Sequence, residues 1–335
     1  MKISVKKKII FFVKADIGFK YGFGHLFRVL SIYKKLDKKK YDIYFFINDQ
    51  TSLKKILKKQ KIKKIFLIKK IFKNKFNHIL NDSLVIFDIF KIKERKIFNF
   101  LNKIKLKKLI CLDTFNDHKL IDIIINGISF TEKKINFKEK SIFQGFQYMC
   151  LPNYADKLKK TSFKKIRNVF LSSGGSDAKK IILKFIPILL NFKNIKINVL
   201  VGPGIKKENK IFYYKSKFPK RINLLSKKKN LIQIISKNDI CLVSGGFIML
   251  ECLSIKMPTI VYKNYEHQKY AINYLKKRNA IYDLGIPSRI NKNKIYDIFK
   301  KIENKNIRQK LEKNISSLID GKGIFRVLKI IDNCF

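Results

Sequence analysis

Short runs of apolar residues alternate along the chain with longer, lysine-studded segments in which apolar positions recur every three or four residues. Short apolar runs bounded by polar residues are typical of buried strands, and the longer spacing is typical of amphipathic helices. The predicted strands are Ile9–Val13, Ile43–Ile47, Ile65–Ile68, Leu84–Asp88, Leu109–Leu112 and Ile121–Ile125 in the first half, and Val169–Leu171, Ile197–Val201, Ile222–Leu225, Ile240–Val243 and Thr259–Tyr262 in the second. The pattern predicts repeated βα units and mostly parallel sheets.

The same βα scheme occurs twice in the 335 residues, which suggests two domains of similar size. The first predicted helix, His25–Leu36, directly follows the first strand. A polar, lysine-rich stretch after Pro152 separates the two halves. We therefore expect α/β domains over residues 1–155 and 156–335, with the last helix able to pack back on the first domain.

The chain is strongly basic, with 76 Lys plus Arg, 24 Asp plus Glu and a formal net charge of +52. Only 8 of the 76 are Arg, whereas recognition of nucleic acid draws heavily on the bidentate guanidinium group. Lys, Ile, Asn and Phe abound while Ala and Pro are scarce, as adenine- and thymine-rich codons would dictate. We interpret most of the charge as coding bias on solvated faces, with residues 54–75 as the densest candidate for a basic partner site.

The five cysteines are widely spaced, odd in number and without a CxxC pair, so they indicate reduced thiols rather than a disulfide framework or a zinc site. The apolar run Ile9–Val13 is too short for a signal peptide, and no run approaches the ~18 apolar residues of a membrane helix. We expect a cytoplasmic protein without an integral membrane segment, although its basic face could contact anionic lipid. The oligomeric state stays open.

Glycine is scarce, with 14 residues, yet three glycine clusters each follow a predicted strand and precede a helix. They are Gly18, Gly22 and Gly24; Ser172–Asp177, of sequence SSGGSD; and Ser244–Gly246. Ligands of open α/β sheets bind at this end of the strands, where backbone N–H groups and helix N-termini can hold phosphates without a metal. The alternative is that each glycine only permits a tight turn. Neither a P-loop nor a full dinucleotide-binding motif is present.

His25 is predicted at a helix N-terminus, directly after Gly24. A lone histidine is often structural, but the positive end of a helix disfavours the imidazolium and leaves the ring able to accept a proton. His25 is therefore a candidate general base. His78 is expected on the surface, and His118, with Asp113 nearby, is a weaker second candidate.

Eight segments in order resemble the UDP-sugar hydrolases of the pseudaminic acid pathway and the related spore-coat polysaccharide proteins, which belong to the GT-B superfamily near the MurG glycosyltransferase. The segments begin with KADIGFKYGFGHLFR and continue with LVIFDIF, CLDTFNDHKLIDIIIN, QGFQY, SSGGSD, VSGGFIMLE, EHQKYAINYL and DGKGIFRV. The resemblance implies a GT-B fold in which two Rossmann-like domains with mostly parallel sheets face each other across a cleft. It also implies hydrolysis of UDP-2,4-diacetamido-2,4,6-trideoxy-β-L-altropyranose to UDP and free sugar, without metal or cofactor.

The resemblance further implies roles for particular residues. His25 matches the histidine to which activation of the attacking water is ascribed. Glu251 matches the acidic residue that binds the ribose hydroxyls. The substrate-binding residues on matching positions are Asp16, Gly22, Gly24, Arg28, Asp88, Tyr148, Ser173, Gly174, Gly175, Ser176, Asp177, Ser244, Gly245, Gly246, Glu251, His267 and Gln268. Structural alternatives stay open: Glu251 as an exposed helix charge, Arg28 as a partner of Asp16, and His267 as a helix cap.

Two other functions stay open beside the UDP-sugar hydrolase. A glycosyltransferase on the same scaffold would pass the sugar to a hydroxyl acceptor instead of water. A protein of a different class would use the basic surface to bind nucleic acid or a membrane surface. The matching segments favour a UDP-sugar as the partner, with no nucleic acid.

Overall fold

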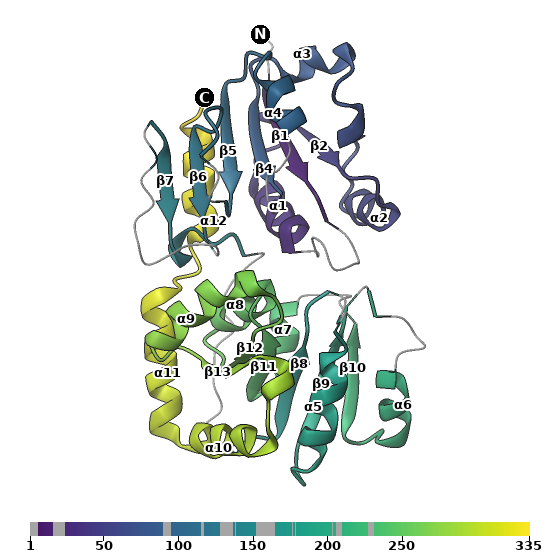
Figure 1. Cartoon of the computed structure of the whole chain (residues 1–335), viewed down its shortest axis with the longest axis vertical. Coiled ribbons are helices and arrows are strands. Elements are labelled where there is room, and N and C mark those ends of the chain that lie inside the picture. Colours follow the sequence, from purple (N-terminus) through teal and green to yellow (C-terminus); the bar gives the residue numbers. More distant parts are fainter. Residues whose placement is uncertain are drawn as a thin grey trace. The chain divides into compact units, whose positions relative to one another are not determined.

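The computed structural model describes residues 6–15, 24–89, 95–114, 117–127, 137, 139–151, 165–175, 177, 179–202, 204–205, 210–226 and 231–335. These residues form two compact units (Figure 1). Unit 1 comprises Met1–Pro152 and Lys322–Phe335, and unit 2 comprises Asn153–Gly321. The last helix therefore belongs to the first unit. The expected boundary placed residues 322–335 in the second domain, with the last helix able to pack back on the first.

Unit 1 is built on a seven-stranded sheet of order β3-β2-β1-β4-β5-β6-β7, in which every neighbouring pair is parallel. Its strands are β1 (Lys7–Val13), β2 (Tyr41–Ile47), β3 (Ile65–Leu67), β4 (Leu84–Asp88), β5 (Lys108–Leu112), β6 (Ile123–Asn126) and β7 (Ser141–Gln144). Its helices are α1 (Gly24–Lys35), α2 (Thr51–Lys59), α3 (Asn77–Leu80), α4 (Arg95–Leu101) and α12 (Gly323–Asp332), with short 3₁₀ turns η1 (Ile68–Lys70), η2 (Asn74–Phe76) and η3 (Phe146–Tyr148).

Both faces of this sheet are covered, which explains why β1 is an unbroken apolar run. Ile9, Phe11 and Val13 pack into a core with residues of α1, α2 and α12. Ile10 and Phe12, on the opposite face, pack with residues of α3 and α4. A strand buried on both sides cannot alternate polar and apolar residues, so the continuous run is the expected pattern for a central parallel strand.

Unit 2 repeats the architecture with a six-stranded sheet of order β10-β9-β8-β11-β12-β13, again parallel throughout. Its strands are β8 (Asn168–Ser172), β9 (Lys196–Val201), β10 (Ile222–Ser226), β11 (Ile240–Ser244), β12 (Thr259–Tyr262) and β13 (Tyr282–Gly285). Its helices are α5 (Ile181–Leu190), α6 (Lys210–Lys217), α7 (Leu231–Ser236), α8 (Phe247–Ser254), α9 (Lys269–Lys277), α10 (Lys292–Glu303) and α11 (Lys305–Leu318), with 3₁₀ turns η5 (Glu266–Gln268) and η6 (Pro287–Arg289).

Each sheet has a point where the strand order reverses. In unit 1 the first strand, β1, lies between β2 and β4, and in unit 2 β8 lies between β9 and β11. The connections on the two sides of such a point run to opposite faces of the sheet, so a crevice forms at the carboxyl ends of the two central strands. The predicted His25 and glycine segments follow these strands in both units.

Helix α12 is the element that ties the end of the chain to unit 1. Its residues Val327 and Ile331 join the core beneath α1, and Asp332 accepts hydrogen bonds from Lys40 and Tyr41. Gly323 begins the helix against the backbone of Met149, where an added Cβ would lie 2.4 Å from the Met149 carbonyl oxygen. Only glycine permits this close approach.

No helix in the described parts of the chain is long and apolar enough to cross a membrane. The five cysteines are all buried free thiols. Among the same described residues, no group of three or more His, Cys, Asp and Glu side chains is arranged to hold a metal ion.

Candidate functional site

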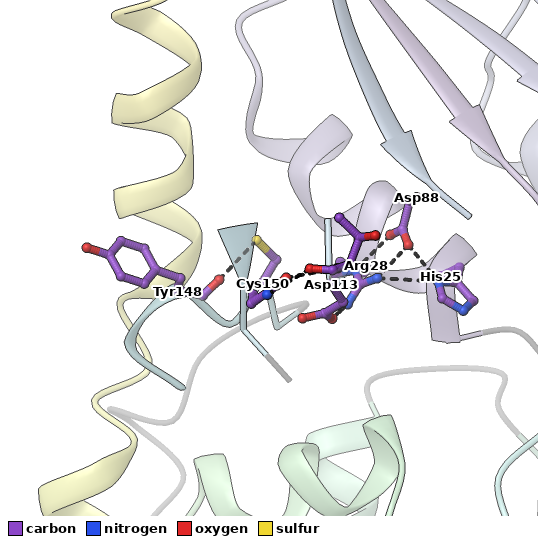
Figure 2. A network of polar contacts seen from close by, with 8 residues as sticks. His25, Arg28, Asp88, Asp113, Tyr148 and Cys150 are labelled. Carbon is purple, nitrogen blue, oxygen red and sulfur yellow. Dashed lines mark hydrogen bonds and ion pairs between the residues drawn. The ribbon is translucent and has the colours of Figure 1, made fainter. Parts of the chain in front are cut away.

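The candidate site in unit 1 is built around Asp88, the last residue of β4. Asp88 is fully buried and pairs in the sheet register with Val13 at the end of β1. Its carboxylate faces the first turns of α1, where His25 Nδ1 lies 2.6 Å from Oδ1 and Arg28 Nε donates to Oδ2 over 2.7 Å (Figure 2). The reversal point of the sheet therefore brings together three residues that the sequence predicted separately.

The charges around Asp88 fix its protonation state. Burial alone would raise the pKa of the Asp88 carboxyl, but the charge of Arg28, the charge of His25 in its protonated form and the hydrogen bonds from both residues hold it below its ordinary value. The group is therefore an ionised carboxylate over the ordinary pH range. An ionised carboxylate only accepts hydrogen bonds.

The tautomer of the neutral His25 ring follows from this contact. Because Asp88 can only accept, Nδ1 carries the proton and donates it to Oδ1, and the 3.3 Å approach of Arg28 Nη2 to the same Nδ1 is then a contact rather than a hydrogen bond. Nε2 is left with the lone pair. A ring held by a carboxylate at one nitrogen and basic at the other is the arrangement of a general base.

Arg28 has a second acidic partner that the sequence did not predict. Its Nη1 forms an ion pair with Asp113, which directly follows β5. Arg28 is thus held by Asp88 and Asp113 together; Asp16, the partner considered from sequence, lies outside the described residues, as does Gly22. The signal was present in the position of Asp113 at the carboxyl end of a strand, but the strand order was needed to place it beside Arg28.

The backbone of Tyr148 contacts Cys150, which lies beside this cluster, but the Tyr148 ring points away from it. The Tyr148 carbonyl lies 3.7 Å from the Cys150 thiol, whereas the ring points away from His25 and Arg28 (Figure 2) and packs 5.4 Å from the ring of Phe143. Burial raises the pKa of the Cys150 thiol to about 12, so this thiol stays protonated. A contact of the Tyr148 ring with substrate stays a prediction.

The described contacts of the other histidines are with residues outside this cluster. His78 is exposed, as predicted. The ring of His118 lies tilted against that of Phe98 with their centroids 4.4 Å apart, and its Nδ1 accepts a hydrogen bond from the Leu120 backbone over 3.3 Å. In unit 2, the ring of His267 stacks on Tyr265 at 5.7 Å.

The candidate site in unit 2 consists of the glycine loops that follow β8 and β11. These strands are neighbours at the reversal point, and the two loops approach so closely that a Cβ on Gly174 would lie 3.9 Å from Ser244 Oγ. Gly174 has a φ of +87°, a left-handed conformation that favours glycine. Gly245 and Gly246 lead into α8, so both predicted loops, with Ser173 and Gly175, lie where an open sheet binds its ligand.

Gly202, a glycine outside the predicted site residues, supports the β8 loop. Gly202 follows β9, and a Cβ there would lie 2.3 Å from the Gly175 carbonyl oxygen and 2.6 Å from that of Gly174. The backbone N–H of Gly204 donates to the same Gly175 oxygen over 2.9 Å. The sequence Val201–Gly204 carried a signal, since it places two glycines directly after a strand in a glycine-poor chain.

Residues that follow β12, the strand next to β11, also contribute to the unit 2 site. The Gln268 side-chain oxygen accepts from the backbone N–H of Asn264 over 2.8 Å, and Asn264 Nδ2 donates to Ser173 Oγ over 3.3 Å. The Gln268 amide nitrogen would lie 3.4 Å from a Cβ on Gly246. Gln268 is therefore fixed beside both glycine loops, while Asn264 was not predicted.

Two acidic residues of unit 2 are buried in different roles. Glu251 on α8 is 3% exposed, so the alternative of an exposed helix charge is wrong. Asp177 accepts a 2.8 Å hydrogen bond from the Ile181 backbone N–H and so caps α5. Ser176, between the loop and this cap, lies outside the described residues.

The Asp177 cap predicts a pH-dependent stability. Burial raises the pKa of Asp177 from 3.8 to about 6, despite opposing hydrogen bonds from Ser173 and the α5 backbone. A raised pKa in the folded state stabilises the fold below pH 3.8, and that contribution is lost as the pH rises through 6, by up to about 3 kcal/mol.

Replacement of Asp177 by Asn keeps an acceptor for the helix and removes the titration. The melting temperature of D177N relative to the parent protein should therefore be higher at pH 7.5 than at pH 4.5. A difference in melting temperature that is the same at both pH values would contradict this account of the cap.

Comparison with known proteins defines the fold class. Over 98% of this chain, the structure matches 99% of MurG from Acinetobacter baumannii with a TM-score of 0.69 and 13% identity. It matches 98% of the MnaA chain of S. aureus, solved with UDP, with a TM-score of 0.61 and 14% identity. The chain therefore has the GT-B fold, with two units that each carry a parallel sheet and helices.

Two proteins are similar to this chain in sequence as well. The chain is 25% identical to the spore coat polysaccharide biosynthesis protein SpsG of Bacillus subtilis over 341 residues, covering 96% of this chain and 97% of the relative. It is 30% identical over 277 residues to an uncharacterized protein of Methanocaldococcus jannaschii, covering 76% of this chain. The chain spans only 56% of the length of that archaeal relative. No known family profile matches the chain.

Proposed function

We propose that the protein hydrolyses a UDP-activated diacetamido-trideoxy sugar to free sugar and UDP. The observation that carries the proposal is the 2.6 Å contact between His25 Nδ1 and the buried Asp88 carboxylate, which leaves Nε2 as the basic nitrogen. Similarity to SpsG, a protein of spore coat polysaccharide biosynthesis, and to the UDP-bound fold of MnaA supports a nucleotide-sugar substrate.

In the proposed reaction, Nε2 of His25 takes a proton from water as the water oxygen attacks the anomeric carbon. The bond between that carbon and the UDP oxygen breaks, and UDP leaves with the bonding electrons. Asp88 stabilises the imidazolium that forms, as the carboxylate of an acid–base pair does. Unit 1 thus supplies the general base, and Arg28 fixes the carboxylate that orients it.

Unit 2 binds the nucleotide in this proposal. Backbone N–H groups of the loop at Ser173–Gly175, together with the N-terminus of α8, would hold the diphosphate. The N–H groups of Gly174, Gly245 and Gly246 donate to Ser172 Oγ and to the carbonyls of Tyr262 and Ser244, so these glycines would shape the site rather than bind the phosphates. Glu251 would accept hydrogen bonds from the ribose hydroxyls, and Gln268 would donate its amide N–H groups to the sugar. The glycine loops and the dipole of α8, rather than a metal ion, would neutralise the leaving group. Tyr148, His267, Gly24 and the residues outside the described ranges stay predicted substrate contacts.

A glycosyltransferase reaction is the second candidate function, because a base that takes a proton from water can equally take one from a hydroxyl acceptor. The similarity of the fold to MurG fits either reaction. Water as the acceptor is our first choice on the resemblance of the eight sequence segments to the UDP-sugar hydrolases.

The two functions are separated by measuring UDP release. The purified chain is incubated with UDP-2,4-diacetamido-2,4,6-trideoxy-β-L-altropyranose, and in parallel with UDP-N-acetylglucosamine, with and without a hydroxyl acceptor. We expect release of UDP in water alone from the diacetamido substrate. Release that requires the acceptor would establish the transferase, and no release under any condition would refute both.

A further inference from the structure

The Arg28 side chain is held between two carboxylates in the interior of unit 1. It donates to Asp88 from Nε and Nη2 and forms an ion pair with Asp113 through Nη1 (Figure 2). The side chains of Arg28, Asp88 and Asp113 are 8%, 0% and 6% exposed. One buried arginine is already neutralised by one carboxylate, so the second carboxylate needs an explanation.

The explanation lies in the charge of the whole cluster. With His25 neutral, the cluster of His25, Arg28, Asp88 and Asp113 carries a net charge of −1; with His25 protonated, its net charge is zero. Buried charge is costly unless it is compensated nearby. The net charge of the cluster is therefore zero only after His25 has taken a proton.

A pair of Asp88 and Arg28 alone would not favour the protonated form of His25. The two groups neutralise each other, so the positive charge of Arg28 would cancel most of the attraction of Asp88 for an imidazolium. Asp113 offsets Arg28 from the opposite side of the guanidinium. The Asp88 carboxylate is then available to His25 while Arg28 still fixes its orientation.

The backbone at Asp113 is held in an unusual conformation. Its φ is +47°, in the left-handed region, where Asp is tolerated better than most residues. The conformation is fixed from both sides, because Asp113 N donates to the Ile125 carbonyl over 2.9 Å and the Asn126 side chain bonds both Thr114 N and O. Such strained positions are typical of functional sites.

We propose that Asp113 is a positioning residue that tunes the general base: by offsetting the charge of Arg28, it allows Asp88 to stabilise the protonated form of His25. The proposal rests on the proposed function of His25 as the base. It adds a residue that contacts Arg28 and acts on the base through Arg28 and Asp88.

Two thiols beside the cluster contribute no charge. Cys111 on β5 and Cys150 border Asp88 and Arg28, and burial raises the pKa of both thiols, to about 12 for Cys150. Both remain neutral over the ordinary pH range. Lys140 adds a positive charge that acts on Cys111. Among the described contacts, the charged side chains joined to one another in the cluster are Arg28 on α1, Asp88 on β4 and Asp113 after β5.

The test is a pH titration of the histidine ring resonances by NMR in the parent protein and in D113N. The chain has only four histidines, His25, His78, His118 and His267, so the His25 signals can be assigned with H25N. Loss of the carboxylate should lower the midpoint of the His25 titration by about 1 pH unit, since a neighbouring opposite charge shifts such a titration by roughly 1–3 units. The rate constant kcat for UDP release should fall with little change in KM.

Two further variants make the test decisive. D49N removes an exposed carboxylate of the same unit, which pairs with Lys69 on the surface, and should leave the His25 midpoint unchanged. D113S removes the charge without placing an amide N–H against the guanidinium, and should lower the midpoint as D113N does. An unchanged midpoint in the folded variants would overturn the proposal, and so would failure of both variants to fold, because a positioning residue must be dispensable for folding.

The ring titration requires no substrate, so its result is independent of the hydrolysis assay. If the parent protein releases no UDP, the proposed function fails while the midpoint still reports whether Asp113 acts on His25. If UDP is released and the midpoint does not move, only the role of Asp113 fails.

Discussion

Replacement of His25 by Asn is expected to lower kcat for UDP release by about 10²–10⁴-fold, the usual contribution of a positioned general base. Asparagine keeps a polar side chain beside the buried Asp88 but has no basic nitrogen to take the proton from water. The affinity for UDP should be unchanged, because unit 2 binds the nucleotide in the proposed mechanism. Steady-state UDP release and calorimetric titration with UDP measure the two quantities separately.

The matched control for this variant is H78N. His78 is an exposed histidine on α3 of the same unit, so its replacement should leave both kcat and UDP affinity as in the parent. Turnover by H25N at the parental rate would show that His25 is not the base. A parallel loss of UDP affinity would show instead that His25 binds the nucleotide.

Replacement of Gly202 by Ala is expected to abolish or strongly weaken UDP binding, by at least about tenfold. The new Cβ would lie 2.3 Å from the Gly175 carbonyl oxygen, so the backbone of the glycine loop after β8 must move. Overpacking of this kind costs about 1–3 kcal/mol, and a loop displaced from the sheet edge no longer presents its N–H groups to a phosphate. Calorimetric titration with UDP and the melting temperature report the two effects.

The matched control is G323A in unit 1. An added Cβ at Gly323 meets the Met149 carbonyl oxygen at 2.4 Å, a clash of the same kind, but far along the chain from the glycine loops. This variant should lose stability while it keeps its UDP affinity. Parental UDP affinity in G202A would mean that the loop at Gly174–Gly175 does not hold the nucleotide.

Much of the fold could be predicted from hydrophobic pattern alone, because central parallel strands are buried on both faces and cannot be confused with exposed segments. All eleven predicted strands occur, with Leu84–Asp88 and Thr259–Tyr262 reproduced residue for residue. The two strands that were missed, β7 and β13, lie at the edges of their sheets. Edge strands are only half covered, and the sequences SIFQ and YDLG lack an apolar run.

The candidate site was predictable in its parts but not in its contacts. His25 and the glycine loops stand out locally, because a strand end, a scarce glycine and a helix start follow one another in the sequence. The pairing of Arg28 with Asp113 joins residues 85 positions apart and depends on the order β1-β4-β5, which the sequence does not state. Asp113 was associated with His118 instead, its neighbour in the chain.

The many lysines contribute little to the candidate sites. The cluster around Asp88 holds one arginine and no lysine among its described contacts. In the proposed function, the glycine loops act through their backbone and not through lysine side chains. The lysines that form ion pairs, such as Lys69 with Asp49, do so on the surface, where such pairs stabilise a protein by at most about 1 kcal/mol. The residues to which we assign chemistry are the scarce ones.

The central claim is that water attacks the anomeric carbon of a UDP-sugar. The most direct test is the UDP-release reaction run in H₂¹⁸O without any acceptor, followed by mass spectrometry of the UDP. Phosphate oxygens do not exchange with water on this timescale, so the label records which bond was broken. We predict UDP without ¹⁸O, released at the rate at which free sugar appears. Label in the β-phosphate would show attack at phosphorus, and either that result or no release of UDP would contradict the proposed hydrolase.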